Sequence, residues 1–315
     1  MSEAPEISFC LPVFNSTERI ERCLRAILAQ SVPSWEILVV DNCSTDDTVA
    51  KAREILQGVP EARVVVNDKN LGRIENWNRW LELATGRYIR FAMVNDVWLP
   101  GSAEMLLNAA HAHPTAVMVC SRARIVTEVP PQPTPVMINP PIQVYETAGL
   151  VRHFCAVSAN DTDSLNTILF QTEVIQREQL RFRADIPFWS DFYFVLEMAE
   201  HGPVVYVQAE SYLFDKGVKG RFVNVGAKVL PYYFEVRTCS TLMARLLAKQ
   251  DAPDWEGFGF LFAQYVNHDW HFGDAPLPGY RDTLALFKDT GPFRRQALKH
   301  RLNWGLRRMF KQSQN

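Results

Sequence analysis

The sequence predicts an α/β protein with a mostly parallel central sheet, helices on both faces of that sheet, and a helical extension at the C-terminus. Short, almost continuously apolar runs alternate with helical patterns through the first 120 residues. Strands of this apolar kind are covered on both faces, as in sheets built with crossover helices. Beyond about Val225 the pattern is helical to the end of the chain.

The predicted strands of the N-terminal part are separated by helices, at least through the fourth strand. One helical stripe is formed by Ile74, Trp77 and Leu81, which recur at helical spacing. Units of strand, helix and strand at this rhythm form right-handed crossovers, which make neighbouring strands parallel. The strands are expected at Ile7–Val13, Trp35–Val40, Arg63–Val66, Tyr88–Val94 and Ala116–Cys120.

The middle of the chain is irregular at first and then returns to strands. The prolines between residues 130 and 141 predict an extended excursion, because proline suits neither a helix interior nor a central strand. Further strands are expected at Thr167–Phe170 and Val204–Gln208, with a helix from about Asp191 to Glu200 between them.

Bulk composition indicates a globular protein and excludes some functions. The 315 residues are 47% hydrophobic, and the formal net charge of −2 says little about partners, because neither sign dominates. No nucleic-acid partner is predicted. The N-terminus has no basic segment followed by an apolar run, and no stretch approaches the roughly 18 apolar residues of a membrane span. We therefore expect a cytoplasmic protein. Its scattered cysteines, without a C-x-x-C pair, are expected to be reduced.

Polar residues gather in segments that follow the predicted strands, where parallel sheets bind their ligands. Asp41 ends the second strand and can accept a hydrogen bond from a ligand N–H, such as the imide of uracil. Capping of the next helix explains Asp46 but leaves Asp41 several residues too early. Asn70, Gly72 and Arg73 precede a helix, whose N-terminus favours an anion.

The fourth strand is followed by Asn95 and Asp96. A carboxylate at this place can hold Mg²⁺ or Mn²⁺, which would bridge the two phosphates of a nucleoside diphosphate. A lone aspartate is weak support for a metal site. Its weight comes from its place beside the other polar segments.

In order and spacing, PVFN, ILVVDNCSTDDT, NLGRIENWN and the strand ending in NDVWLP resemble glycosyltransferase family 2 over roughly residues 6–215. The resemblance implies the GT-A fold. We divide the chain into a catalytic domain over 1–225, with a nucleotide-binding half (1–120) and an acceptor half (121–225), and a helical region over 226–315. The implied reaction is an inverting transfer from a nucleotide-diphosphate sugar, UDP-linked, to a hydroxyl of a glycan or polyprenyl-linked acceptor in surface polysaccharide or glycolipid synthesis.

The resemblance also assigns residues. Asp41 would contact the base, and Asp96 matches the last aspartate of the metal motif. The family usually reads Asp-x-Asp-Asp there, whereas this chain reads Met93, Val94, Asn95 and Asp96, so we expect weaker metal affinity. The residues expected to bind the donor are Pro12, Phe14, Asn15, Asp41, Asn70, Gly72, Arg73 and Asn95.

Asp191 is the predicted catalytic base. It enters an apolar helix at the position where the family places the carboxylate that deprotonates the acceptor hydroxyl. The alternative is a carboxylate that only stabilises the helix N-terminus. Asp185 is the reserve candidate.

Two basic segments allow two interpretations each. Lys216, Lys219 and Arg221 either close over the donor phosphates or form a solvated loop. Residues 292–311 carry basic side chains without an acid, and they either bind an anionic membrane surface or pack on the domain. Membrane binding would place the protein at the inner face of the membrane.

Two other functions were weighed. The depleted metal motif would also suit a non-catalytic nucleotide-sugar-binding or scaffold protein. A nucleotidyltransferase is disfavoured, because no glycine-rich basic loop follows the first strand.

Overall fold

The computed structural model describes residues 4–95, 97–126, 129–130, 133–146, 165–186, 189–215 and 242. The chain divides into two compact units, Met1–Leu150 with Ala159–Phe222, and Val151–Ser158 with Val223–Asn315. Every element named below belongs to the first unit. Apart from Leu242, the predicted helical region over 226–315 lies outside the described residues, as does the basic segment 292–311.

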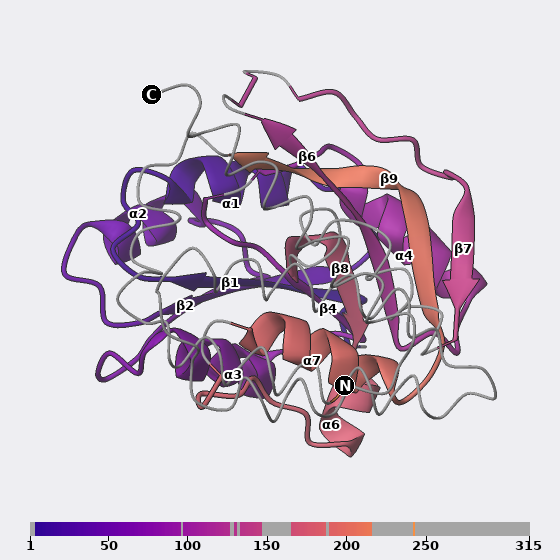
Figure 1. Ribbon diagram of the computed structural model, residues 1–315. Coiled ribbons are helices and arrows are strands. Elements are labelled where there is room, and N and C mark those ends of the chain that lie inside the picture. Colours follow the sequence, from indigo (N-terminus) through magenta and orange to yellow (C-terminus); the bar gives the residue numbers. More distant parts are fainter. Residues whose placement is uncertain are drawn as a thin grey trace, which may run out of the picture. The chain divides into compact units, whose positions relative to one another are not determined.

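Strands and helices alternate through the N-terminal part of the first unit (Figure 1). The elements are β1 (Ile7–Val13), α1 (Ile20–Leu28), β2 (Trp35–Asp41), α2 (Thr48–Ile55), β3 (Ala62–Val66), α3 (Arg73–Leu83), β4 (Tyr88–Phe91), β5 (Val97–Trp98), α4 (Ser102–Ala112), β6 (Met118–Val126), β7 (Ile142–Tyr145), η1 (Leu165–Thr167), β8 (Ile168–Gln171), α6 (Thr172–Arg177), α7 (Ser190–Ala199) and β9 (Val204–Asp215).

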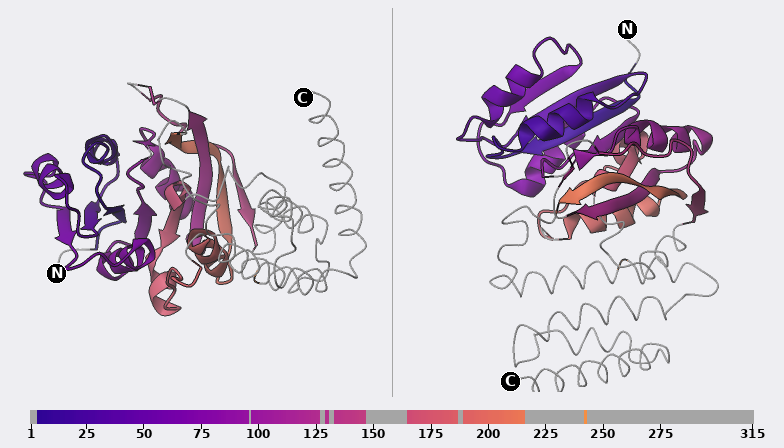
Figure 2. Two further views of the ribbon diagram at one scale, coloured as in Figure 1. Left: turned by 60° about the vertical axis from the view of Figure 1, so that its left-hand side comes forward. Right: turned by 90° about the horizontal axis from the view of Figure 1, so that it is seen from above.

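These strands form one sheet in the order β3-β2-β1-β4-β8-β6-β9-β5, with β7 paired to the N-terminal part of β9. The strands β3, β2, β1 and β4 are mutually parallel, and β8 runs antiparallel between β4 and β6. Figure 2 shows β6, β9 and β7 at the opposite end of the sheet from β3. The predicted crossovers therefore account for the first half of the sheet.

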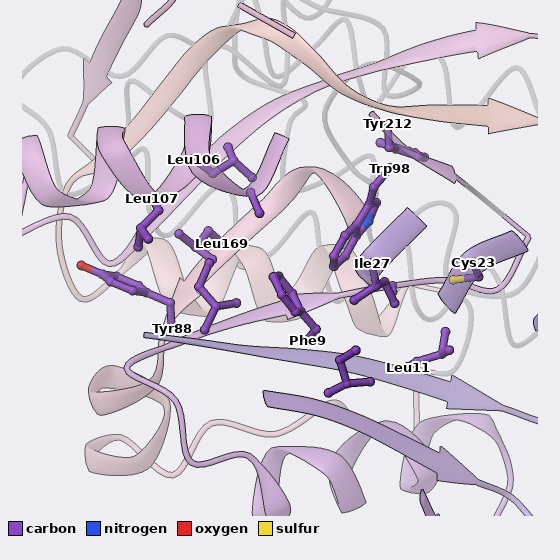
Figure 3. Packing of buried hydrophobic residues seen from close by; sticks show 14 of the residues in the cluster. Phe9, Leu11, Cys23, Ile27, Tyr88, Trp98, Leu106, Leu107, Leu169 and Tyr212 are labelled. Carbon is purple, nitrogen blue, oxygen red and sulfur yellow. The ribbon is translucent and has the colours of Figure 1, made fainter. Parts of the chain in front are cut away.

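Helices cover both faces, with α1 and α2 on one side of β1 and β2 and α3 and α7 on the other (Figure 1). The core on the α1 side includes Phe9 and Trp98, whose ring centroids lie 5.2 Å apart in an edge-to-face contact. Figure 3 shows Ile27 of α1 beside this pair. Apolar burial of this kind is the main stabilising term of the fold.

The opposite face holds an aromatic core. Trp80 packs edge-on against Phe91 of β4 at 3.8 Å, and Phe182 stacks on Phe194 of α7 at 4.2 Å. Phe91 and Phe182 are 5.3 Å apart and join the two pairs. This core fixes α3 and α7 on the same face of the sheet.

The elements follow the sequence expectations with local differences. β1 has the predicted bounds. β4 ends at Phe91 instead of Val94, because the backbone N–H of Met93 donates to the side chain of Asn166 rather than to a neighbouring strand. Helix α4 and the short strands β5 and β7 were not predicted.

Candidate functional site

The first two polar segments meet at the carboxyl ends of β1 and β2. Val13 and Asp41 are register partners at these ends. The backbone N–H of Asn15 donates to Ser44 Oγ over 2.8 Å, and Asn15 Oδ1 accepts from the backbone N–H of Thr45 over 2.9 Å. Asn15 thus joins the two loops.

Asp41 is fully buried and closes a tight turn. Its carboxylate accepts from the backbone N–H of Ser44 over 2.8 Å and from the Ser44 hydroxyl. Cys43 has a φ of +65°, which the turn requires. A carboxylate offers about four lone-pair sites, so these two bonds leave acceptor capacity for a ligand N–H. Asp41 therefore has a structural role in the turn, and its contact with a base stays a prediction.

Asp46 binds the start of α2, as the sequence suggested. Its carboxylate accepts from Thr48 N over 3.1 Å and from Thr17 N over 3.3 Å. Burial acts to raise the pKa of Asp46, but the hydrogen bonds from Thr48 and Thr17 outweigh it and lower the pKa to about 2. Asp46 is thereby a link between the β1 loop and α2.

A network of asparagines joins the second and third polar segments, and sequence reasoning missed most of it. Asn42, directly after Asp41, donates to Asn70 Oδ1 over 2.9 Å and accepts from Leu71 N over 2.8 Å. Asn67 donates to Asn42 Oδ1 and to Asn76 Oδ1, over 3.3 Å and 2.8 Å. The recurrence of asparagine at strand ends was the available signal.

This network holds the entry to α3. Asn70 Oδ1 accepts from Gly72 N over 2.9 Å, and Gly72 has a φ of +81°, a conformation that favours glycine. Apart from Gly72 and its two chain neighbours, no residue has an atom within 4 Å of the place where a Cβ on Gly72 would stand. Arg73 follows as the first residue of α3, with its guanidinium 4.7 Å from the Trp77 ring centroid. The loop is therefore open to a ligand beside a helix N-terminus and a cation.

Asp191 lies in the first turn of α7. Burial raises the pKa of the Asp191 carboxyl, the positive charge of Arg73 acts to lower it, and so does the Phe192 backbone N–H, which lies 2.9 Å from Oδ1. The net direction is upward. The predicted base and a predicted donor-binding cation are thus within electrostatic reach of each other.

Asp185, the reserve candidate, has the opposite environment. Its carboxylate is paired with Arg183, with Nε and Oδ1 3.0 Å apart, and two thirds of its side chain is exposed (66%). The hydrogen bond from Arg183 lowers the pKa of Asp185. A weaker base results, so the environment of Asp191 suits proton abstraction better.

Buried side chains fix the position of the segment after β4. Asn166 Oδ1 accepts from Met93 N over 2.7 Å. The buried Arg90 donates to the carbonyl oxygen of Asn166 over 3.4 Å and to Ser102 Oγ over 2.9 Å, and its guanidinium lies 4.0 Å from the Trp98 ring centroid. Burial lowers the pKa of Arg90 to about 9. This buried cation therefore positions the segment that leads to Asn95.

Asn95 itself contacts two arginines of the α1 region. Arg19 Nη1 donates to Asn95 Oδ1 over 3.0 Å, and Arg22 Nη2 donates to the Asn95 carbonyl oxygen over 3.3 Å. Asp96, the predicted metal ligand, lies outside the described residues. Within the described ranges, no three His, Cys, Asp or Glu side chains gather as they would around a metal ion. An amide oxygen already bound by a guanidinium is a poor ligand for Mg²⁺ or Mn²⁺, so the described residues do not fit that ion.

The remaining predicted residues are placed as follows. Phe14 is 45% exposed at the end of β1, next to the half-buried Pro12. Lys216, Lys219 and Arg221 lie outside the described residues. No helix of the described part is long and apolar enough to cross a membrane.

Comparison with known proteins matches the N-terminal part of the chain to a family and to several relatives. Residues 8–156 match the model of the family described as glycosyl transferase family 2. The chain is 36% identical over 107 residues to a teichuronic acid biosynthesis glycosyltransferase, TuaG, of Bacillus subtilis, covering 33% of this chain and 41% of that protein. It is 28% identical over 102 residues to WfgD of Escherichia coli, a β-1,3-glucosyltransferase named for UDP-Glc and α-D-GlcNAc-diphosphoundecaprenol, covering 32% of this chain and 40% of that protein. The matched stretch is less than half of each relative.

Solved structures show the fold. TarS of Staphylococcus aureus in complex with UDP superposes with a TM-score of 0.60 at 17% identity, over 85% of this chain and 72% of that one. A mannosyltransferase of Pyrobaculum calidifontis, in complex with GDP-Man and Mn²⁺, superposes with a TM-score of 0.53 at 18% identity, over 95% of this chain and 85% of that one. These neighbours are GT-A transferases. Residues 8–156 of this chain are thus similar to glycosyl transferase family 2, and the whole fold is of the GT-A type.

Proposed function

We propose that this protein is an inverting glycosyltransferase that moves a sugar from a nucleotide-diphosphate sugar, UDP-linked, to a hydroxyl of a glycan or lipid-linked acceptor. The observation that carries the proposal is the placement of Arg73, the predicted donor-binding cation, and Asp191, the predicted base, in the first turns of α3 and α7, which cover the same face of the sheet. The group that stabilises the leaving phosphate and the group that deprotonates the acceptor hydroxyl must lie on the two sides of the same anomeric carbon. The two residues lie 118 positions apart in the sequence (191 − 73), in different helices.

The reaction would be a single displacement. The acceptor oxygen forms a bond to the anomeric carbon while the bond from that carbon to the diphosphate oxygen breaks, through an oxocarbenium-like transition state. The electron pair of the broken bond leaves with the diphosphate, and Asp191 takes the proton of the hydroxyl. Arg73 and the N-terminus of α3 stabilise the charge that develops on the leaving group.

The environment of Asp191 suits this role. Burial raises the pKa of its carboxyl, and a carboxylate with a raised pKa is a stronger base. The positive charge of Arg73 opposes this rise in the pKa.

The acceptor and the cellular context are inferred from the relatives. TuaG is named for teichuronic acid biosynthesis, and WfgD is named for a diphosphoundecaprenol acceptor. We propose a surface polysaccharide or glycolipid pathway for this chain, with a polyprenyl-linked acceptor. Such an acceptor would place the protein at the cytoplasmic face of a membrane, with residues 292–311 on anionic lipid.

The test is donor turnover by the purified full chain. Release of nucleoside diphosphate is measured from UDP-Glc, UDP-GlcNAc and GDP-Man with polyprenyl-diphosphate sugar acceptors, in EDTA and with added Mn²⁺ or Mg²⁺. We expect release from a UDP-sugar and a product of inverted anomeric configuration by NMR. Retained configuration would show that the inverting assignment is wrong.

A second candidate is a non-catalytic nucleotide-sugar-binding protein. It is favoured by Met93 and Asn95, which stand where the family usually has acids. The same experiment separates the two functions. A protein that binds UDP-sugars by calorimetry, but releases no nucleoside diphosphate with any acceptor or metal, would be a binding protein.

A further inference from the structure

In the segment after β4, two arginines contact Asn95, which stands where the family usually has an acid. Arg19, the N-cap residue of α1, donates to the side-chain oxygen of Asn95 over 3.0 Å. Arg22, one helical turn further on, donates to the carbonyl oxygen of the same residue over 3.3 Å. Two guanidinium groups therefore converge on the residue whose side-chain oxygen would be a metal ligand.

This arrangement disfavours a divalent cation. The amide oxygen of Asn95 carries no net charge and already accepts a charge-assisted hydrogen bond. The thioether of Met93 is a soft ligand, and Mg²⁺ and Mn²⁺ prefer oxygen. A guanidinium at hydrogen-bond distance also repels a metal ion, because like charges at such range interact strongly near a protein surface.

The same arrangement suits a diphosphate. Arginine presents five N–H donors in a rigid fork that matches phosphate oxygens, and the bond to Asn95 uses one donor of Arg19. Arg19 follows the β1 loop directly. The end of β4 lies beside β1, since Ala92 N donates to Cys10 O over 2.8 Å. Arg19 therefore lies between the predicted nucleotide loop and the end of β4.

We propose that Arg19, with Arg22 beside it, binds the donor diphosphate at the end of β4 in place of a divalent cation, so that this chain binds nucleoside diphosphates without a metal ion. This rests on the proposed function, because it assigns the phosphate contacts of the same donor site. Asn95 then has a positioning role: its side-chain oxygen aims the Arg19 guanidinium.

The chain offers a matched control on the same helix. Arg25 pairs with Glu21, with Nη2 and Oε1 2.9 Å apart, and its charge is thereby balanced. Among the ion pairs of the described part of the chain, none involves Arg19. A comparison of the Arg25 and Arg19 variants thus separates the effect of removing any arginine charge from α1 from the specific effect of removing the charge of Arg19.

The experiment is calorimetric titration of the full chain with UDP, in EDTA and with Mn²⁺. We expect the two dissociation constants of the wild type to agree within about threefold. In EDTA, Arg19→Gln should weaken UDP binding by about tenfold or more, whereas Arg25→Gln should stay within about twofold of wild type. Arg19→Lys, which keeps the charge and loses the fork, should lie between them. Inorganic pyrophosphate should compete with UDP for the wild type.

Three outcomes would overturn the proposal. If the wild type binds UDP only with Mn²⁺, the donor site requires a metal ion and the proposal is wrong, whereas the proposed function is unaffected. Unchanged UDP binding by Arg19→Gln, with a wild-type melting temperature, would remove Arg19 from the site. Failure of the wild type to bind UDP or GDP under either condition would overturn the proposed function as well. The comparison of UDP binding in EDTA and with Mn²⁺ uses the wild type alone. It therefore tests the metal-free binding of UDP even if Arg19→Gln does not fold.

Discussion

Arg73, the first residue of α3, acts electrostatically on Asp191, in the first turn of α7. The two helices cover the same face of the sheet, where Phe182 and the aromatic side chains of β4 and α7 fix their positions. Burial and a nearby cation move the pKa of the Asp191 carboxyl in opposite directions, and burial prevails. The relationship ties proton abstraction to the predicted donor loop.

Replacement of Asp191 by asparagine tests the base. Asp191→Asn keeps the shape of the side chain but removes the proton acceptor, so turnover should fall by about 10²–10⁴. Donor binding by calorimetry should change little. Asp185→Asn is the control, because Asp185 is mostly exposed and paired with Arg183. Near-normal turnover of Asp191→Asn would show that another group takes the proton.

Replacement of Arg73 should move the pH dependence of the reaction. Arg73 lowers the pKa of Asp191, so Arg73→Gln should raise that pKa further. Because the base acts when it is deprotonated, the acidic limb of the kcat/KM profile should shift to higher pH. Arg79→Gln on the same helix is the control, since Arg79 pairs with the exposed Glu82 over 3.1 Å. An acidic limb that stays in place in Arg73→Gln would remove the electrostatic link.

The asparagine network predicts a coupled loss of stability and donor binding. Asn42→Ala would leave the Leu71 N–H without this partner and remove one of the two hydrogen bonds of the Asn67 amide, at a cost of about 1–3 kcal/mol in the free energy of unfolding. UDP binding should weaken, because the loop before α3 loses its attachment to β2. Urea unfolding and calorimetry measure the two effects. Lys69→Ala, at an exposed position of the same loop, should change neither.

The carboxylate of Asp46 predicts a pH-dependent part of the stability. The pKa of Asp46 is about 2 in the folded protein, below its ordinary value. The contribution is therefore complete above the unfolded pKa, about 4, and is lost as the pH falls through the folded value. Asp46→Ala should lower the free energy of unfolding by about 1 kcal/mol at pH 7. Urea titrations should show the difference from wild type shrinking toward pH 2, and a constant difference would contradict the assignment.

The sequence by itself determined the alternating strands and helices of the first 120 residues, because apolar periodicity reflects burial directly. β1 was predicted at its observed bounds, and the polar residues were correctly expected beyond the strand ends. The family resemblance added the GT-A fold. Hydrogen bonds between near neighbours in the sequence, such as that between Asp46 and Thr48, could also be predicted from the sequence, because helix capping depends on adjacent residues.

Only the tertiary structure decided which distant residues act together. The contact between Arg19 and Asn95 joins positions 76 residues apart, and no periodicity signals such a pair. The same is true of Arg73 with Asp191, and of Arg90, a buried cation in a run that reads as an ordinary strand. Pattern in one sequence reports the environment of each residue, whereas charge and hydrogen-bond partners across the sheet depend on how the crossovers place the strand ends.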